Sequence, residues 1–159
     1  MDHLSLRGAH WEMGFQWGAR LAERGRFLLD HVPFSLTAER RAFAAACRPA
    51  YERDFPAALA ELEGLAAGQS CPREDLETVL FTTYALPPAC GCSCLAVSNG
   101  NGVFFGRNSD FLTALEPYNT HAAYQFSDGA IPFAGNTTSF VQMEDAVNAR
   151  GLAVGLTSV

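Results

Sequence analysis

The chain has 159 residues, of which 48% are hydrophobic, and its formal net charge at pH 7 is −6. This length and composition suffice for the core of a globular protein, and the acidic balance leaves no basic stripe for nucleic acid. No segment reaches the roughly 20 apolar residues of a membrane span, and the first residues lack a signal-peptide pattern. We therefore expect a cytoplasmic protein with no nucleic-acid or membrane partner.

The first ninety residues have the apolar spacing of helices. Apolar side chains recur at intervals of three and four residues, and prolines at positions 33, 49, 72, 87 and 88 separate the segments. This pattern predicts helices over Trp11–Val32, Ala38–Arg48, Phe55–Ala67 and Glu74–Tyr84. The aromatic residues of the first segment are expected to fill a helical core: Trp11, Phe15, Trp17 and Phe27.

After residue 90 the sequence changes to short apolar runs separated by Gly, Asn and Pro, as is typical of strands and turns. Two Asn-Gly pairs at residues 99–102 predict a hairpin between the first two runs. Asn136-Thr137-Thr138 is expected in a loop, and Asn148 in the turn before the last strand. An α+β fold that divides near residue 90 follows, with strands over Leu95–Val97, Val103–Phe105, Ala122–Phe126, Phe140–Gln142 and Leu152–Leu156.

The predicted hairpin brings together residues that can carry chemistry. Its strands lie about 5 Å apart, so Cys92, near the start of the first strand, faces the stretch from Arg107 to Asp110. The permanent charge of Arg107 favours a thiolate, while Asp110 can orient a protonated amine or hold Arg107 in place. This trio predicts a cysteine nucleophile for amide-bond chemistry.

The residue before the cysteine points to self-cleavage. Gly91 has no β-carbon, so the Cys92 sulfur can reach the preceding carbonyl with little steric hindrance. An N-to-S acyl shift followed by hydrolysis would leave Cys92 as a new N-terminus. Its α-amine, with a reference pKa of about 7.7–8.0, can then accept the thiol proton. Nucleophile and base would share one residue.

Each of these residues also has a purely structural interpretation. A cysteine on an apolar strand, taken alone, is more often a small buried hydrophobe, and Arg107 with Asp110 can form a simple ion pair. Neither the cysteines nor the four histidines have metal-ligand spacing, so no metal or other cofactor is expected. The cysteine spacing is not that of a secreted disulfide framework, which favours reduced thiols at Cys47, Cys71, Cys90, Cys92 and Cys94.

Three ordered motifs resemble the N-terminal-nucleophile hydrolases, specifically the branch that contains isopenicillin N acyltransferase and the linear-amide hydrolases. Gly91-Cys92 resembles the self-processing bond of the acyltransferases, and residues 106–110 resemble the Gly-Arg-Asn-x-Asp segment of bile-salt and penicillin V amidases. Residues 148–156 resemble the Asn-Glu-x-Gly-Leu turn and the strand that follows it. The opening, residues 7–18, is similar to the first strand and helix of that family.

The resemblance implies an αββα sandwich, with a helical pro-segment or α subunit over residues 1–91 and the N-terminal part of the catalytic sandwich over 92–159. The 67 residues from Ser93 to Val159 supply about half of its strands, and the chain ends on an apolar run, so a truncated sandwich is expected. The resemblance assigns catalysis to Cys92, Arg107 and Asp110, with Thr157 at the oxyanion position. Two departures are Thr157, where many relatives have Asn, and Ala149, which replaces the usual Glu.

Together these features predict an autoproteolytic amide hydrolase or acyltransferase. It would move an acyl group from a small-molecule amide or thioester substrate to water or an amine. The alternative is a non-catalytic remnant that acts as a folded or assembling partner and associates through an open sheet edge. A redox protein using Cys90 and Cys94 is disfavoured, because their spacing is not that of a C-x-x-C motif.

Overall fold

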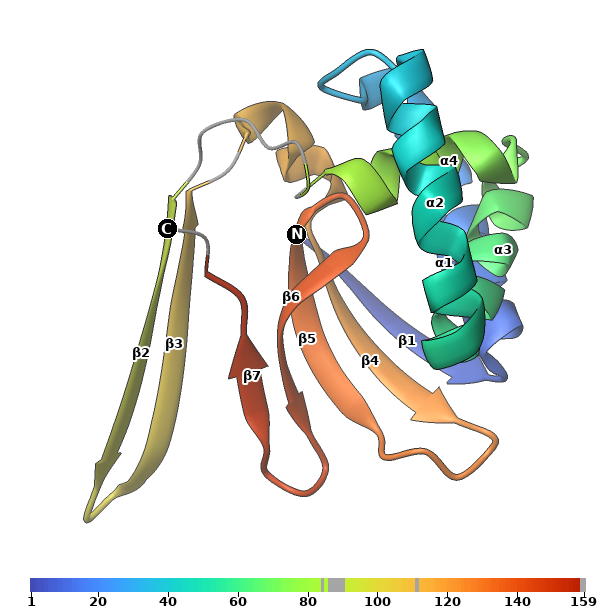
Figure 1. The fold of residues 1–159 in the computed structure, drawn as a ribbon. Coiled ribbons are helices and arrows are strands. Elements are labelled where there is room, and N and C mark those ends of the chain that lie inside the picture. Colours follow the sequence, from blue (N-terminus) through green and yellow to red (C-terminus); the bar gives the residue numbers. More distant parts are fainter. Residues whose placement is uncertain (84, 86–90, 111, 158–159) are drawn as a thin grey trace. The chain divides into compact units, whose positions relative to one another are not determined.

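The computed structural model describes residues 1–83, 85, 91–110 and 112–157, and it has the α+β fold expected from the sequence (Figure 1). The chain divides into two compact units. The first, Leu6–Pro87 with Gln125–Ala130, contains the α-helices. The second, Met1–Ser5 with Pro88–Tyr124 and Ile131–Val159, contains most of the strands. The functional boundary between residues 91 and 92 stays a prediction.

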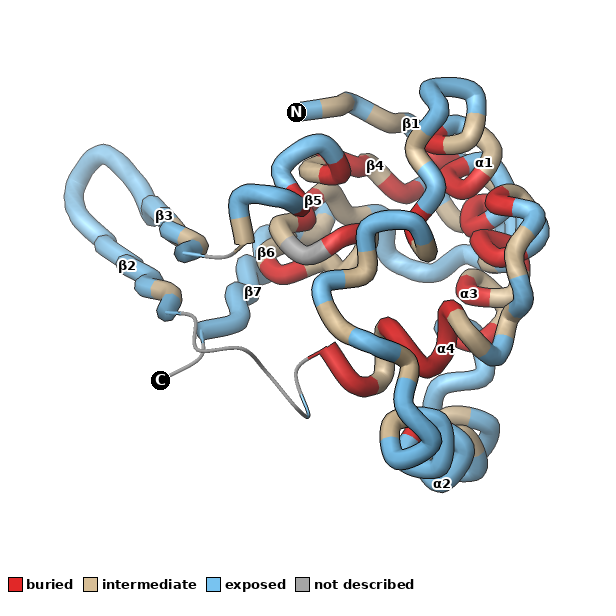
Figure 2. Tube along the Cα trace, turned by 90° about the horizontal axis from the view of Figure 1, so that it is seen from above, coloured by how far each residue is buried: buried red, intermediate tan, exposed pale blue. Residues whose placement is uncertain are grey.

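Apolar side chains from several helices form the core of the helical unit, and Figure 2 shows buried stretches on α1, α3 and α4. The α-helices are α1 (His10–Ala22), α2 (Ala38–Asp54), α3 (Pro56–Gln69) and α4 (Arg73–Thr82), with a short 3₁₀ helix at Leu28–His31. The hydroxyl of Thr37 caps α2 by accepting a hydrogen bond from the Arg40 backbone N–H at 3.3 Å. The predicted end of the fourth helix, Tyr84, lies outside the described residues.

Helices α1 and α3 approach each other so closely that four glycines form the contact. Gly14 and Gly18 of α1 face the backbone of α3, and Gly64 and Gly68 of α3 face the backbone of α1. A β-carbon at Gly68 would lie 2.5 Å from the carbonyl oxygen of Phe15. Because the glycines of each pair are four residues apart, each helix presents a shallow groove without side chains to the other. The backbones therefore meet where side chains would normally interdigitate.

The first helix is shorter than predicted, because it ends at Ala22 instead of Val32. Gly25 adopts a φ of +67°, a conformation that glycine reaches without strain. The N–H of Arg26 donates to the carbonyl of Leu21 at 2.9 Å, which turns the chain back on the helix end. The expectation of one helix over residues 11–32 was therefore wrong.

Three of the four aromatic residues expected in a helical core are partly exposed. Trp17 is buried as predicted, but Trp11, Phe15 and Phe27 are between 41% and 44% exposed. The rings of Trp11 and Phe15 stack on each other with centroids 5.4 Å apart. The glycine contact explains the exposure of Trp11 and Phe15, since the backbone of α1 packs against α3 at both residues and leaves no room for the rings. Phe27 lies beyond the end of α1.

Pro49 does not end the second helix, which was predicted to stop at Arg48. Helix α2 continues through the proline to Asp54, although a proline removes one backbone hydrogen bond. Polar contacts hold α2 against α4 on the N-terminal side of Pro49: Arg40 with Thr82, Arg41 with Asp75, and Arg48 with Glu77. These tertiary contacts offset the missing hydrogen bond.

The strands form a five-stranded sheet and a separate hairpin. The sheet has the order β1-β4-β5-β6-β7, and the pairs from β4 to β7 are antiparallel. Its strands are β1 (Asp2–Gly8), β4 (Thr120–Phe126), β5 (Phe133–Ser139), β6 (Gln142–Asn148) and β7 (Ala153–Gly155). The hairpin consists of β2 (Gly91–Asn99) and β3 (Gly102–Asp110).

The hairpin confirms the prediction made from the Asn-Gly pairs. Asn99 is paired with Gly102 across a two-residue loop, and the Asn99 side chain accepts a hydrogen bond from the Asn101 N–H at 2.8 Å. Gly102 has a φ of +135°, which a residue with a β-carbon rarely adopts. The turn therefore sets the register of the whole hairpin.

Two predictions for the second half of the chain were wrong. Phe140 was expected in a strand, but it lies in the tight turn between β5 and β6 with a φ of +55°. It is buried there against the ring of Tyr118, so a core aromatic was mistaken for part of a strand. Residues 136–138, expected in a loop, belong to β5. The turn at Asn148 is confirmed, because its side chain accepts hydrogen bonds from the N–H groups of Arg150 and Leu152.

Candidate active site

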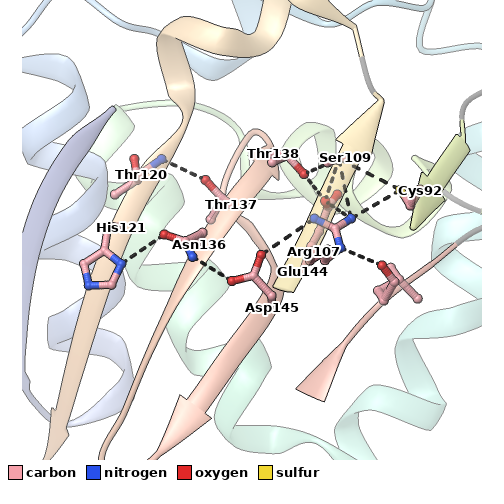
Figure 3. A network of polar contacts seen from close by, with 11 residues as sticks. Cys92, Arg107, Ser109, Thr120, His121, Asn136, Thr137, Thr138, Glu144 and Asp145 are labelled. Atoms are coloured by element: carbon pink, nitrogen blue, oxygen red, sulfur yellow. Dashed lines mark hydrogen bonds and ion pairs between the residues drawn. The ribbon is translucent and has the colours of Figure 1, made fainter. Parts of the chain in front are cut away.

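The hairpin register brings the sulfur of Cys92 next to the guanidinium of Arg107 (Figure 3). Cys92 is paired with Ser109, and Cys94 with Arg107, so all four side chains lie on one face of the hairpin. Arg107 donates from a terminal nitrogen to Cys92 Sγ at 3.3 Å. A cation at this distance favours the thiolate over the thiol.

Arg107 is almost fully buried and is held from several sides. Its terminal nitrogen donates to Glu144 Oε2 at 2.7 Å, and the two side chains are only 3% and 1% exposed. Its Nε donates to the carbonyl oxygen of Leu156 at 2.7 Å, and Asp145 lies 3.7 Å from its other terminal nitrogen. Two carboxylates and the thiol thus surround one positive charge, and the two carboxylates repel each other as like charges.

A bulge in β6 explains how two consecutive carboxylates face the same arginine. Asn136 of β5 is paired with Asp145, but the next residue, Thr137, is paired with Met143. Glu144 is therefore the extra residue, and a bulge turns neighbouring side chains toward the same side of a sheet. In a regular strand Glu144 and Asp145 would point to opposite faces.

Two hydroxyl groups connect the sulfur with Glu144. Ser109 Oγ lies 3.9 Å from Cys92 Sγ and donates to Thr138 Oγ1 at 2.9 Å. The Thr138 hydroxyl donates to Glu144 Oε2, and Ser109 Oγ itself is 3.4 Å from that oxygen. The sulfur, the two hydroxyls and the carboxylate thus form a continuous line of polar groups, visible in Figure 3.

Burial raises the pKa of Glu144 to about 7, and the neighbouring charge of Asp145 contributes to the shift. The loss of solvation disfavours the charged carboxylate, and the like charge of Asp145 disfavours it further. Near neutral pH, Glu144 therefore exchanges between a carboxylate and a carboxylic acid. A group with this behaviour can accept and return a proton.

The raised pKa predicts that the protein loses stability as the pH rises. Between pH 4.5 and 8 the unfolded chain releases the Glu144 proton first, so the free energy of unfolding should fall by about 2–3 kcal/mol. Urea denaturation at both pH values measures this change. The Glu144→Gln variant, which cannot titrate there, should lack it. A wild-type stability that rises with pH relative to the variant would contradict the prediction.

A further row of polar side chains crosses the sheet on the same face as Arg107. The amide of Asn136 donates to Asp145 Oδ1 at 2.7 Å, and its oxygen lies 3.0 Å from His121 Nδ1. These contacts fix the carboxylate of Asp145, whose other oxygen faces Arg107. The row therefore orients Asp145 from the side away from the sulfur.

Asp110 does not join Cys92 and Arg107 on their face of the hairpin. It is paired with Gly91, and positions 107 and 110 have opposite parity, so its side chain lies on the other face. There it accepts a hydrogen bond from the amide of Asn108 at 2.9 Å and is exposed. Its backbone is nevertheless directly opposite the residue that precedes Cys92.

The remaining residues singled out from the sequence lie around this group. Thr157 follows β7 and is exposed. The carbonyl of the residue before it, Leu156, accepts a hydrogen bond from Arg107 Nε. Cys94 lies beside Arg107 in the register and is exposed, whereas Cys90 falls outside the described residues. No disulfide joins the cysteines in the described ranges: Cys47, Cys71, Cys92 and Cys94.

An apolar cavity of about 530 Å³ opens on β5, β6 and β7. The side chains of Phe133, Ala146 and Val154 alternate along their strands with those of Asn136 and Asp145, which face Arg107. Most of the apolar lining is therefore on the reverse face of the sheet from the sulfur. The cavity nevertheless adjoins the site, because Glu144, Asp145 and Leu156, which contact Arg107, also form part of its wall.

Comparison with known proteins adds no further assignment: no protein-family model and no curated protein matches this sequence. Within the part of the chain that the structure describes, no cluster of three His, Cys, Asp or Glu side chains could hold a metal ion. No helix among those same residues combines the length and apolar character needed to cross a bilayer.

Sequence reasoning missed four residues of this group: Ser109, Thr138, Glu144 and Asp145. Successive side chains of a strand point to opposite faces. Applied to β3, this rule places Ser109 on the same face as Arg107 and Asp110 on the other. Thr138 was assigned to a loop. Glu144 depends on a bulge, which no periodic pattern in the sequence indicates.

Proposed function

We propose that this chain is a self-processing amide hydrolase or acyltransferase in which Cys92 is the nucleophile. The observation that carries the proposal is the 3.3 Å contact between Cys92 Sγ and the buried guanidinium of Arg107. A buried arginine beside a sulfur has a clear use in chemistry, because it stabilises the anion that attacks a carbonyl. A cysteine that only fills space needs no cation.

In this proposal the bond between Gly91 and Cys92 is the first substrate. Attack by the sulfur on the Gly91 carbonyl forms a thioester, and water then releases the new N-terminus at Cys92. The freed α-amine serves as base in later turnovers on an external amide or thioester. Asp110 would hold this amine, because its backbone is paired with Gly91 and the amine belongs to the next residue.

The finer fold proposal is that residues 92–159 form the N-terminal part of an αββα sandwich and that residues 1–91 form its pro-segment. The motifs described from the sequence support this, as does a hairpin that carries apolar side chains on both faces. Thr157 is proposed near the oxyanion site, because the adjacent carbonyl of Leu156 binds Arg107. Removal of one oxyanion donor typically costs roughly 10²–10³ in rate.

Mass spectrometry of the purified, folded protein tests the proposal. We expect the wild-type chain to break between Gly91 and Cys92 and the Cys92→Ala variant to stay intact, because the variant has no nucleophile. Cys94→Ala is the matched control, since Cys94 lies on the same face two residues later, and it should still be cleaved. A folded wild-type chain that remains intact overturns the proposal.

A second candidate function is that of a non-catalytic assembling partner. Leu95, Val103 and Phe104 of the hairpin are 66%, 80% and 55% exposed, so the hairpin offers apolar surface for association. Size-exclusion chromatography with a thiol-reactive acyl probe separates the two functions. A remnant should associate without labelling at Cys92, whereas the enzyme should be labelled there.

A further inference from the structure

Self-cleavage needs a base that the freed α-amine cannot supply. Before the bond breaks, the nitrogen of Cys92 is part of the amide to Gly91, and an amide nitrogen does not accept protons near neutral pH. The first step must therefore use another group to take the thiol proton. This inference rests on the self-cleavage proposed above and concerns only the intact chain.

The described structure provides one carboxylate connected to the sulfur through hydroxyl groups. The path runs from Cys92 Sγ to Ser109 Oγ at 3.9 Å, then to Thr138 Oγ1 at 2.9 Å. Thr138 donates onward to Glu144 Oε2. Each hydroxyl can accept one proton while it donates another, so a proton can pass along the line without any side chain changing place.

The surroundings of Glu144 suit a proton acceptor. Its side chain is 1% exposed, so water does not compete for its oxygens. Among the described residues, the charged groups near it include Arg107, at 2.7 Å, and the neighbouring Asp145 on the same strand. Burial holds the pKa of Glu144 at about 7, which is close to the value at which a base is most effective at neutral pH.

We propose that Glu144 accepts the thiol proton of Cys92 in the first self-cleavage step, through the hydroxyls of Ser109 and Thr138. Arg107 stabilises the resulting sulfur anion, which is 3.3 Å away. After cleavage the α-amine of Cys92 takes over as base. Glu144 then holds Arg107 in position and no longer accepts the thiol proton.

The step is balanced in atoms and charge. The Cys92 thiol gives its proton to Ser109, Ser109 gives its own to Thr138, and Thr138 gives its own to Glu144. The sulfur bonds to the Gly91 carbonyl carbon as the bond from that carbon to the Cys92 nitrogen breaks. The proton on Glu144 returns through Thr138 to Ser109, and Ser109 delivers its own proton to this nitrogen, which leaves as an amine. Water later hydrolyses the thioester.

Two measurements on the full chain distinguish a proton acceptor from a group that only adjusts charge. The first is the rate of cleavage at pH 7.5, followed by mass spectrometry. The second is the rate at which iodoacetamide alkylates Cys92 in the intact chain, followed by peptide mapping, which reports the thiolate without any cleavage. Glu144→Gln should cleave roughly 100-fold or more slowly, the usual contribution of a general base. It should alkylate at least as fast as wild type, because Arg107 loses a competing anion.

Asp145→Asn is the matched control. It removes the neighbouring carboxylate from Arg107 but leaves the path through Ser109 and Thr138 complete. We expect its alkylation to be faster than in wild type. Its cleavage should slow far less than that of Glu144→Gln, because losing the Asp145 charge lowers the pKa of Glu144 but leaves the proton acceptor in place. If Glu144 only adjusted the charge of Arg107, both substitutions would raise cleavage and alkylation together, which overturns the proposal.

Two more variants keep the test decisive if Glu144→Gln folds poorly. Ser109→Ala should slow cleavage about tenfold or more with little change in alkylation, and Glu144→Asp should retain part of the cleavage. Equal loss of cleavage and alkylation in Ser109→Ala would indicate a structural role and overturn the proposal.

If wild type stays intact while Cys92 is alkylated, self-cleavage itself fails. If wild type and Glu144→Gln are cleaved at the same rate, only the role of Glu144 fails.

Discussion

Replacing Arg107 with methionine is expected to lower the free energy of unfolding by about 3–5 kcal/mol at pH 8, measured by urea denaturation. The substitution keeps an unbranched side chain of similar length but leaves the buried carboxylate of Glu144 without its cation. Alkylation of Cys92 by iodoacetamide should slow by about tenfold or more, because the sulfur also loses the nearby positive charge.

The pH dependence of this loss identifies its cause. At low pH the Glu144 carboxyl is protonated and needs no cation, so the destabilisation by Arg107→Met should be smaller at pH 5 than at pH 8. The double variant with Glu144→Gln should recover part of the stability at pH 8. Arg150→Met, in an exposed turn, is the control and should leave stability and alkylation unchanged. A loss of equal size at both pH values would show that packing, not charge, is responsible.

Replacing Gly64 with alanine is expected to destabilise the helical unit by at least about 2 kcal/mol, the cost of overpacking a close contact. The added β-carbon would overlap the carbonyl oxygen of Trp11 on α1. Backbone atoms cannot rotate away as a side chain can, so the two helices must separate. Alanine normally stabilises a helix relative to glycine by about 1 kcal/mol. A loss of stability in Gly64→Ala would therefore come from the close contact and not from helix propensity.

Thermal and urea denaturation measure this effect, and Gly100→Ala provides the control. Gly100 lies in the hairpin turn without a positive φ, and a β-carbon added there would have no atoms within 4 Å. It should tolerate alanine with a change below about 0.5 kcal/mol. If Gly64→Ala were as stable as wild type, the close approach of α1 and α3 would be incorrect.

Local sequence determined the turn and the strand register of the β2–β3 hairpin. The Asn-Gly pairs fix the turn at Asn99, and a two-residue turn fixes every pair along the hairpin. For this reason the sequence alone could place Cys92 opposite the end of β3, within reach of Arg107. The α+β character likewise follows from local periodicity, which changes from helical to strand-like near residue 90.

The contacts that surround Arg107 depend on residues far apart in the chain. Glu144 is 37 positions after Arg107, and it reaches the guanidinium because the bulge in β6 turns it to that side. Ser109 and Thr138 are 29 positions apart in the chain. Their hydroxyls meet because the fold brings β5 next to the hairpin. Hydrophobic patterning reports which face of a strand is apolar, but it does not report which polar partner a folded chain brings to the other face.

The glycines of α1 and α3 show the same division. Helical periodicity in the sequence indicated both helices, although it made the first one too long, and it favoured the large aromatic residues of the first helix as its core. Only the tertiary structure decides that Gly14, Gly18, Gly64 and Gly68 form the contact, because close packing depends on the shape of both partners at once. The sequence by itself determined the local elements and the cation nearest to Cys92. The folded chain decided which buried carboxylate and which hydroxyls contact Arg107 and Cys92. Packing between distant segments sets the distances between these groups, and neighbours along the chain do not.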